Sequence, residues 1–367
     1  MAMPEASPLL LIQLTAPGRG AVASCRIEGP GALDVVARHF ITRSGRPLAD
    51  FPPGRIVVGQ LGLSGEEVVL NRRSDRAIEL HCHGGVAAVA RMEEIFVNGG
   101  CRLAPWQDWI ASQEADPIAA AARLALAEAR TTPAAAILLD QYRGALRRAM
   151  EQIEASLQTG EKEAARQQID ALLAQADTGL HLTRPWQVVV AGLPNVGKSS
   201  LINAIAGYQR AIVHSTPGTT RDVIGLQTAM DGWPVEISDT AGLRETDDRI
   251  EQAGIDLARQ KILAADLLVL VCDSSLPWSE HDQTLFESYP TALLVHNKSD
   301  LPRATGQRPS GMELSAMRSA GIDTLCHEIG LRLVPCPPPP GAAVPFEPEQ
   351  IEHIRGYLDQ CGRTQLG

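Results

Sequence analysis

The fold is decided by Gln187-Val188-Val189-Val190-Ala191 and the residues that follow directly, Gly192-Leu193-Pro194-Asn195-Val196-Gly197-Lys198-Ser199. The first run is apolar and β-branched, which predicts a buried strand. The second matches G-x-x-x-x-G-K-[ST] at every fixed position. Glycines let backbone N–H groups converge on phosphate oxygens, and a helix beginning near Lys198 adds its positive dipole end. Because strand, loop and helix are in register, the stretch favours a phosphate-binding loop over a plain strand-to-helix turn.

On either side of this loop, apolar runs alternate with helical stretches. Further strands are predicted at Pro234 to Ser238, Leu267 to Cys272 and Ala292 to His296. This alternation is typical of a mainly parallel sheet with crossover helices. We therefore expect an α/β P-loop NTPase domain, in which ligands bind beyond the carboxyl ends of the strands.

Polar motifs follow the predicted strands in an order that indicates a guanine nucleotide. Asp239-Thr240-Ala241-Gly242 places a carboxylate where it can hold Mg²⁺ through water and a glycine N–H where it can meet the γ-phosphate. Lys198 is predicted to reach the β and γ phosphates, and the Ser199 hydroxyl to ligate Mg²⁺. The Asp300 carboxylate in Asn297-Lys298-Ser299-Asp300 can accept both N–H donors of the guanine edge, which adenine lacks. Ser315-Ala316 is predicted to close over the base.

Composition limits the class of protein. The net charge of -10, from 33 Lys+Arg against 43 Asp+Glu, argues against a surface for non-specific nucleic-acid capture. The 7 cysteines include no C-x-x-C pair, which indicates reduced cytosolic thiols, and no apolar stretch approaches a membrane span. We expect a cytoplasmic protein with no membrane partner.

The pattern divides the chain into four regions. A small α+β domain is expected over residues 1–118, the first part of a helical domain over 119–184, and the nucleotide domain over 185–333. The run Cys336-Pro337-Pro338-Pro339-Pro340-Gly341 predicts an extended linker within 334–367, followed by one short helix.

Three segments closely resemble the MnmE (TrmE) tRNA-modification GTPases: residues 192–200, 216–222 (Thr-Pro-Gly-Thr-Thr-Arg-Asp) and 239–245 (Asp-Thr-Ala-Gly-Leu-Arg-Glu). Residues 16–20 with Cys25-Arg26-Ile27, and 78–80 with His83-Gly84-Gly85, are similar to the folate-binding domain of that family. The resemblance touches most of the chain and is most specific in the nucleotide domain. It implies a G domain set into a helical domain and preceded by a folate-binding-like domain.

The resemblance also implies roles for individual residues. Thr220 matches the switch threonine on Mg²⁺, and Asn195 with Thr216 and Thr219 matches a K⁺ site that replaces an arginine finger. Leu243 stands where a glutamine would orient water, and Glu251 matches the glutamate that does so in this family; the alternative is a solvated glutamate at a helix start. The residues predicted to contact the nucleotide are Asn195, Val196, Gly197, Lys198, Ser199, Ser200, Thr216, Thr219, Thr220, Asp239, Gly242, Asn297, Lys298, Asp300, Ser315 and Ala316.

Arg26 and Glu79 match positions associated with reduced folate, and the alternative for them is an ordinary ion pair at strand ends. The stretch from Trp106 to Pro117 lacks the basic residue expected near its middle. The chain also ends without the family's Cys-Ile/Val-Gly-Lys tail, and Cys361 is not its equivalent.

Two functions follow. The first, which the resemblance implies, is a GTPase of tRNA wobble-uridine modification that binds GTP and GDP, forms a homodimer, and acts on tRNA with an FAD-containing MnmG-like partner. The second is a divergent, C-terminally shortened regulatory GTPase without the modification chemistry. An assembly GTPase of the Era or Der type is less favoured, because no RNA-binding module flanks the G domain.

Overall fold

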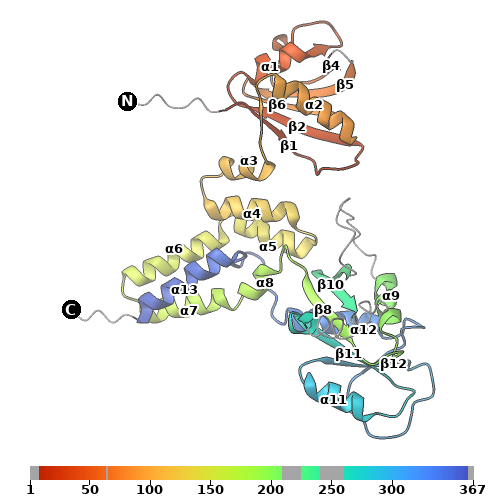
Figure 1. Ribbon diagram of the computed structural model, residues 1–367. Coiled ribbons are helices and arrows are strands. Elements are labelled where there is room, and N and C mark those ends of the chain that lie inside the picture. The colour runs from red at the N-terminus through yellow and green to blue at the C-terminus, as the bar shows by residue number, and fades with distance from the viewer. Residues whose placement is uncertain (1–7, 63–64, 209–224, 240–259, 363–367) are drawn as a thin grey trace. The chain divides into compact units, whose positions relative to one another are not determined.

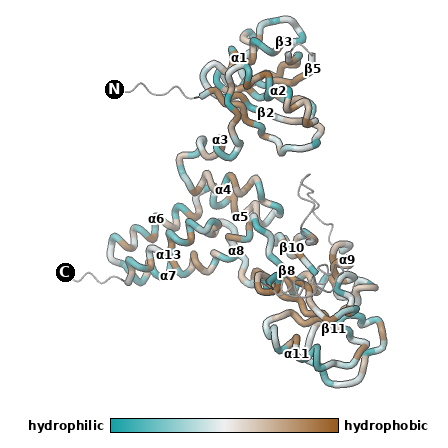
Figure 2. Tube along the Cα trace, in the orientation of Figure 1, coloured by the Kyte–Doolittle hydropathy of each residue, from teal (hydrophilic) through white to brown (hydrophobic). Residues whose placement is uncertain are grey.

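A computed structural model describes residues 8–62, 65–208, 225–239 and 260–362 (Figure 1). These residues form two compact units, one up to Ala120 and one from Ala121 onward. In both units, hydrophobic residues concentrate along the strands (Figure 2).

The first unit is built on a seven-stranded sheet with the order β3-β4-β5-β6-β2-β1-β7. Neighbouring strands are antiparallel except β1 and β7, which are parallel. The strands are β1 Leu10–Gln13, β2 Val22–Glu28, β3 Phe40–Thr42, β4 Ile56–Leu61, β5 Glu66–Ser74, β6 Ala77–His83 and β7 Arg102–Leu103. The helices are α1 Ala32–His39, α2 Val86–Asn98 and α3 Trp106–Gln113, with the short 3-10 helix η1 Leu48–Asp50.

Alternation along the strands places the core on one face of this sheet. In β2, Ala23, Cys25 and Ile27 are buried and their neighbours are not, as the period of two in a strand requires. Helices α1 and α2 pack on β6 and complete the core. The predicted α+β mixture is confirmed. Strands β3 and β7 and helix α3 were not predicted.

The second unit contains a six-stranded sheet with the order β13-β12-β11-β8-β10-β9. All neighbouring pairs are parallel except β10 and β9, so the expected mainly parallel sheet is confirmed. The strands are β8 Trp186–Ala191, β9 Gly225–Met230, β10 Trp233–Asp239, β11 Leu267–Asp273, β12 Leu293–Asn297 and β13 Met312–Glu313. Strand β9 was not predicted. Because β8, β10, β11 and β12 are parallel, their carboxyl ends lie at one edge of the sheet.

Helices cover this sheet. Helices α9 (Lys198–Tyr208) and α12 (Ile322–Leu333) contact each other and the strands. Side chains of α11 (Glu280–Ser288) pack on a cluster that includes Val189 and Leu268. The strands are therefore buried as continuous apolar runs, which is the pattern that identified them in the sequence.

The rest of the second unit is helical. Its helices are α4 Pro117–Glu128, which begins within the first unit, α5 Thr132–Tyr142, α6 Ala145–Gln158, α7 Lys162–Leu173, α8 Ala176–Leu180 and α13 Pro348–Gly362. The blue α13 lies beside the yellow-green α6 and α7 although it is distant in sequence (Figure 1). No helix in the described part of the chain is long and apolar enough to cross a membrane.

The proline-rich segment before α13 is held by the buried Gln141 and its neighbour Asp140. Gln141 donates from Nε2 to the Ala342 carbonyl at 3.0 Å, and its Oε1 accepts from the Val344 N–H at 3.1 Å. The Asp140 carboxylate accepts from the Gly341 N–H at 2.7 Å. The segment forms no helix or strand between α12 and α13, as its prolines predicted. Two side chains of α5 therefore hold the backbone of the segment that leads into α13.

Candidate nucleotide site

The loop between β8 and α9 is a tight structure that needs its glycines. Gly192 has φ 148°, and a Cβ there would lie 2.2 Å from the Val271 carbonyl oxygen. Gly197 has φ 97°, and its Cβ would lie 2.3 Å from the Asn297 side-chain nitrogen. Both positions are closed to larger residues by space and by backbone conformation. The loop backbone is therefore restricted to one conformation, in which Gly192 contacts β11 and Gly197 contacts Asn297.

Lys198 is the first residue of α9, and its side chain is folded back onto the loop. The residue is only 7% exposed, and its ammonium group donates to the carbonyls of Gly192 and Leu193 at 3.0 Å each. A buried ammonium group needs such partners. The positive charge is thus held within the loop whose sequence predicted phosphate binding.

Ser199 and Asp239 meet across two parallel strands. The Ser199 hydroxyl donates to Asp239 Oδ2 at 3.0 Å. Asp239 ends β10, where it pairs in register with Val190 of β8, and this register brings it to the first turn of α9. A hydroxyl and a carboxylate oxygen side by side are the hard ligands that Mg²⁺ prefers. The donor set fits the predicted Mg²⁺ site.

Asn297 joins the phosphate loop to the loop after β13. The residue is 2% exposed, its Nδ2 donates to the Val196 carbonyl at 2.9 Å, and its Oδ1 accepts from the Ala316 N–H at 3.0 Å. Both ends of the amide are therefore satisfied by backbone. Asn297 was predicted as a nucleotide contact, and the structure gives it these two backbone contacts.

The Asp300 carboxylate is oriented by a hydrogen bond from Ser315. The Ser315 hydroxyl donates to Asp300 Oδ1 at 2.5 Å, and Ser315 Oγ accepts from the Arg318 N–H at 3.2 Å. The hydrogen bond from Ser315 holds the pKa of Asp300 below its usual value, with a smaller contribution from Arg318. An ionised carboxylate fixed at one oxygen can accept N–H donors at the other. This is the chemistry that distinguishes guanine from adenine.

Lys298 bridges two loops, and one of its partners was missed in the sequence. Its ammonium group donates to the Asn195 carbonyl at 2.8 Å and to Asp273 Oδ2 at 2.6 Å. Asp273 is the last residue of β11. The signal for it was a carboxylate directly after the apolar run Leu267 to Cys272, the same signal that identified Asp239.

The structure brings eight predicted residues and Asp273 to one edge of the sheet through the contacts above: Asn195, Val196, Lys198, Ser199, Asp239, Asn297, Lys298 and Ala316. Gly197 lies against Asn297, and Asp300 and Ser315 follow in the adjoining loops. Ser200 lies in α9. Thr216, Thr219, Thr220, Gly242 and Glu251 fall outside the described residues, so their roles stay predictions.

Arg26 and Glu79 lie on adjacent strands of the first unit. Arg26 pairs with Glu79 at 3.1 Å and with Glu28 at 2.6 Å, and its guanidinium lies 5.0 Å from the ring centre of Trp109. Glu79 pairs in addition with Arg73 at 2.9 Å. These contacts fit the ion-pair interpretation and already occupy both side chains. The stretch that lacks the expected basic residue contributes Trp109 instead, which donates to Glu28 at 3.0 Å.

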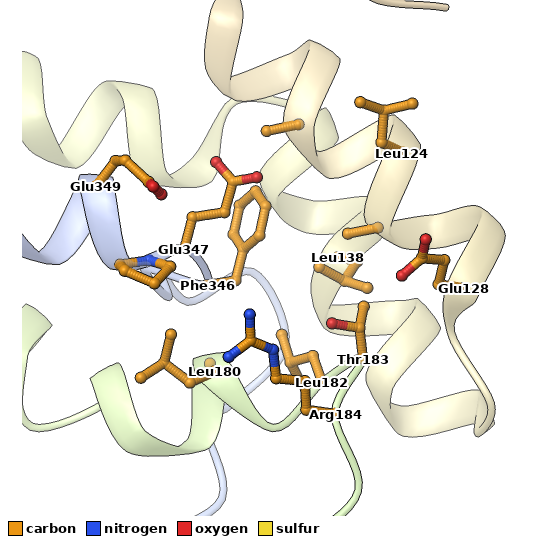
Figure 3. Close-up of a pocket in the computed structure, with 14 residues that line it drawn as sticks. Leu124, Glu128, Leu138, Leu180, Leu182, Thr183, Arg184, Phe346, Glu347 and Glu349 are labelled. Atoms are coloured by element: carbon orange, nitrogen blue, oxygen red, sulfur yellow. The ribbon is translucent and has the colours of Figure 1, made fainter. Parts of the chain in front are cut away.

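A separate cavity of about 380 Å³ lies in the helical part of the second unit (Figure 3). Glu128, Arg184 and Glu347 surround it together with apolar side chains such as Leu138 and Phe346. Burial raises the pKa of Glu347, and the nearby charge of Glu349 raises it further. None of the residues that line this cavity belongs to the nucleotide site.

Comparison with known proteins agrees with this geometry. A family model described as 50S ribosome-binding GTPase matches residues 187–298, which include the phosphate loop, Asp239 and Lys298. The tRNA modification GTPase MnmE of Geobacillus kaustophilus is 33% identical over 359 residues, covering 86% of this chain and 77% of the relative. MnmE of Geobacter sulfurreducens is 33% identical, covering 86% of this chain and 79% of the relative, and MnmE of Thermotoga petrophila is 30% identical, covering 85% and 79%. By sequence along most of its length, the chain belongs to the MnmE family of tRNA modification GTPases.

Proposed function

We propose that this chain binds GTP and hydrolyses it to GDP, and that it does so as part of tRNA wobble-uridine modification. One observation supports this best. The buried amide of Asn297 joins the phosphate loop at Val196 to Ala316, and the neighbouring Ser315 hydroxyl donates to Asp300. A phosphate loop and a guanine-selecting carboxylate are thereby parts of one site.

The residues divide the work of binding. The Asp300 carboxylate accepts hydrogen bonds from the two N–H donors on the guanine edge. The Ser315 hydroxyl orients this carboxylate by donating to Asp300 Oδ1. The loop N–H groups and Lys198 hold the phosphates. Ser199 ligates Mg²⁺ and Asp239 holds it through water, with Thr220 as its further proposed ligand. The ion offsets the negative charge that the phosphates carry.

Guanine selection is tested by changing the hydrogen bonds at one position. Asp300→Asn replaces one acceptor with a donor, so it pairs with xanthine, which carries a carbonyl where guanine carries an amino group. We expect a loss of affinity for a fluorescent GDP analogue of about 100-fold or more, and a gain for the xanthosine analogue. Lys198→Ala is the control, because it weakens binding of both nucleotides. A variant that loses both in equal measure contradicts the proposed role of Asp300.

Hydrolysis is proposed to use Glu251 and K⁺. Leu243, after the Asp-Thr-Ala-Gly motif, is apolar and cannot orient water, so Glu251 holds the attacking water. Asn195, Thr216 and Thr219 hold K⁺ at the phosphates. We expect turnover to be faster in KCl than in NaCl, and Glu251→Ala to bind GTP normally but hydrolyse it slowly. Equal rates in both salts count against the cation, and a wild-type rate in Glu251→Ala counts against the glutamate.

The wider setting is proposed from the family. Partners are tRNA, an FAD-containing MnmG-like protein and a second copy of this chain, and the first domain, over residues 1–118, binds a reduced folate. Folate would have to replace the ion pairs of Arg26 and Glu79, and titration with a reduced folate tests this, with Arg26→Ala as control. Mass spectrometry of tRNA from a deletion strain tests the modification. Unchanged wobble uridines favour the regulatory GTPase instead.

A further inference from the structure

Asp273 lies at the centre of the nucleotide site but belongs to none of the motifs that identified it. It ends β11, and its side chain is only 7% exposed. Its register partner on β12 is Asn297, the residue that joins the two loops. The N–H of the next residue, Ser274, donates to the Asn297 carbonyl at 2.9 Å. Asp273 therefore stands at a hydrogen-bonded strand end, directly beside Asn297.

The carboxylate of Asp273 is oriented by its own strand end. Oδ1 accepts from the Ser275 N–H at 2.9 Å and from the Ser275 hydroxyl at 2.6 Å. This leaves Oδ2 for Lys298, whose ammonium group lies 2.6 Å away. Burial alone would raise the pKa of Asp273, but the hydrogen bonds from Lys298 and Ser275 outweigh it and the pKa is lowered. The Asp273 carboxylate is therefore ionised, and its Oδ2 faces the Lys298 ammonium group.

Lys298 depends on such a partner. Its backbone is in the left-handed region, with φ 64°, and its side chain is 32% exposed. A lysine side chain has four flexible bonds, and holding it in one geometry costs rotamer entropy that a bound partner must offset. The ion pair with Asp273 directs its ammonium group to the Asn195 carbonyl, at 2.8 Å. Asn195 is itself in the left-handed region, with φ 65°.

We propose that Asp273 is a positioning residue for nucleotide binding: it fixes the Lys298 ammonium group on the Asn195 carbonyl and so holds the phosphate loop in its binding shape. The inference rests on the proposed function. Asp273 touches no nucleotide in this scheme. It acts through Lys298, and removing either member of the pair has the same consequence for the loop.

The test is a double-mutant cycle in the full chain, read as affinity for a fluorescent GDP analogue. Asp273→Asn keeps the size of the side chain and its contact with Ser275 but removes the charge. We expect about a tenfold loss of affinity for Asp273→Asn and a loss at least as large for Lys298→Met, because Lys298 is also a predicted nucleotide contact. The double variant should lose no more affinity than Lys298→Met alone. Losses that multiply in the double variant overturn the proposal, because the two residues then act independently.

Asp266→Asn is the matched control for a purely structural effect. Asp266 directly precedes β11, at the opposite end of the same strand, and its carboxylate is paired with His181. We expect this variant to lower the melting temperature without changing affinity for the analogue. If Asp273→Asn behaves in the same way, Asp273 stabilises the fold only and the inference is wrong. If the wild-type chain fails to bind the analogue at all, the proposed function itself fails.

Discussion

The imidazole of His181 lies flat against the indole of Trp186, with ring centroids 3.6 Å apart and planes 8° from parallel. Its Nε2 lies 3.4 Å from Asp266 Oδ2, and its Nδ1 lies 2.9 Å from the Asp177 carbonyl oxygen. Asp266 Oδ2 also accepts from the Gln187 N–H at 2.6 Å. One histidine thus links the end of α8 to the start of β8 and the start of β11. The other ends of those two strands carry the phosphate loop and Asp273.

This junction makes stability depend on pH. Burial lowers the pKa of His181, but the hydrogen bonds with Asp266 and with the Asp177 carbonyl outweigh it, so the pKa is raised above 6.5. Burial of Asp266 is likewise outweighed by the hydrogen bonds from His181 and Gln187, and its pKa is lowered below 3.8. Because folding raises the pKa of His181, the protonated imidazole stabilises the fold fully below about pH 6.5. This stabilisation is lost as the pH rises through the raised pKa. The stabilisation that the Asp266 carboxylate contributes is lost as the pH falls through the lowered pKa of Asp266.

We therefore expect the free energy of unfolding to fall by about 0.5–1 kcal/mol between pH 5.5 and pH 8.5 through this contact. His181→Phe keeps the ring stack but removes the charge. The free energy of unfolding of this variant should therefore fall less over the same pH interval, by that amount. Urea unfolding of both proteins at the two pH values measures the difference. Identical pH dependence in the two proteins removes His181 as the cause.

The loop glycines are expected to be essential for binding. Gly197→Ala places a methyl group against the Asn297 amide at a left-handed position, which costs roughly 1–2 kcal/mol before any displacement of Asn297. We expect at least about a tenfold loss of affinity for GDP, since 1.4 kcal/mol is a factor of ten. Gly207→Ala is the matched control in α9, where an added Cβ meets nothing within 4 Å and helix propensity improves. Equal affinity in the two variants would falsify the steric argument.

Asn297 is expected to matter for both stability and binding. Asn297→Asp cannot donate to the Val196 carbonyl and sets a carboxylate oxygen near it, although it can still accept from the Ala316 N–H. A buried group that loses its hydrogen bond costs about 1–3 kcal/mol. We expect a lower melting temperature together with weaker binding of GDP in calorimetric titration. Asn203→Ala, on the exposed face of α9, should leave binding unchanged and should not lower the melting temperature, because alanine is the better helix former. A similar loss there would point to a general effect of the substitutions.

Much of the site was predictable because each of its motifs ends a strand. Once the apolar runs were identified as parallel strands, Ser199 and Asp239 were expected near each other, and their hydrogen bond of 3.0 Å agrees with that expectation. The pairing of Asp273 with Lys298 was not predictable in the same way. It depends on β11 lying between β8 and β12, and strand order is not encoded in the period of any one strand.

Short elements and long-range polar contacts also escaped prediction. Strand β7 has two residues, too few to show alternation, and its place follows from pairing with β1. In the sequence, Gln141 resembles any polar residue of a helix. It is nevertheless fully buried, and its amide donates to the carbonyl of Ala342, which lies 201 positions away. Such a polar residue is identified only by the partner it meets in the folded chain.

The attachment of α13 gives a last prediction. Gly179 lies in α8, and a Cβ there would lie 1.9 Å from the Pro345 carbonyl oxygen, well inside any tolerated contact. Gly179→Ala must therefore displace the segment that Gln141 holds, and with it the buried Val344 and Phe346. We expect a loss of about 2–3 kcal/mol in the free energy of unfolding, typical of a disrupted core contact.

Gly356→Ala is its counterpart within α13, where an added Cβ meets nothing within 4 Å. Alanine is favoured over glycine in a helix interior by about 1 kcal/mol, so this variant should unfold at a higher temperature than the wild-type chain. The two substitutions are chemically identical and differ only in what the new methyl group meets. Thermal unfolding that shifts both variants in the same direction therefore contradicts the close packing of α8 against the segment before α13.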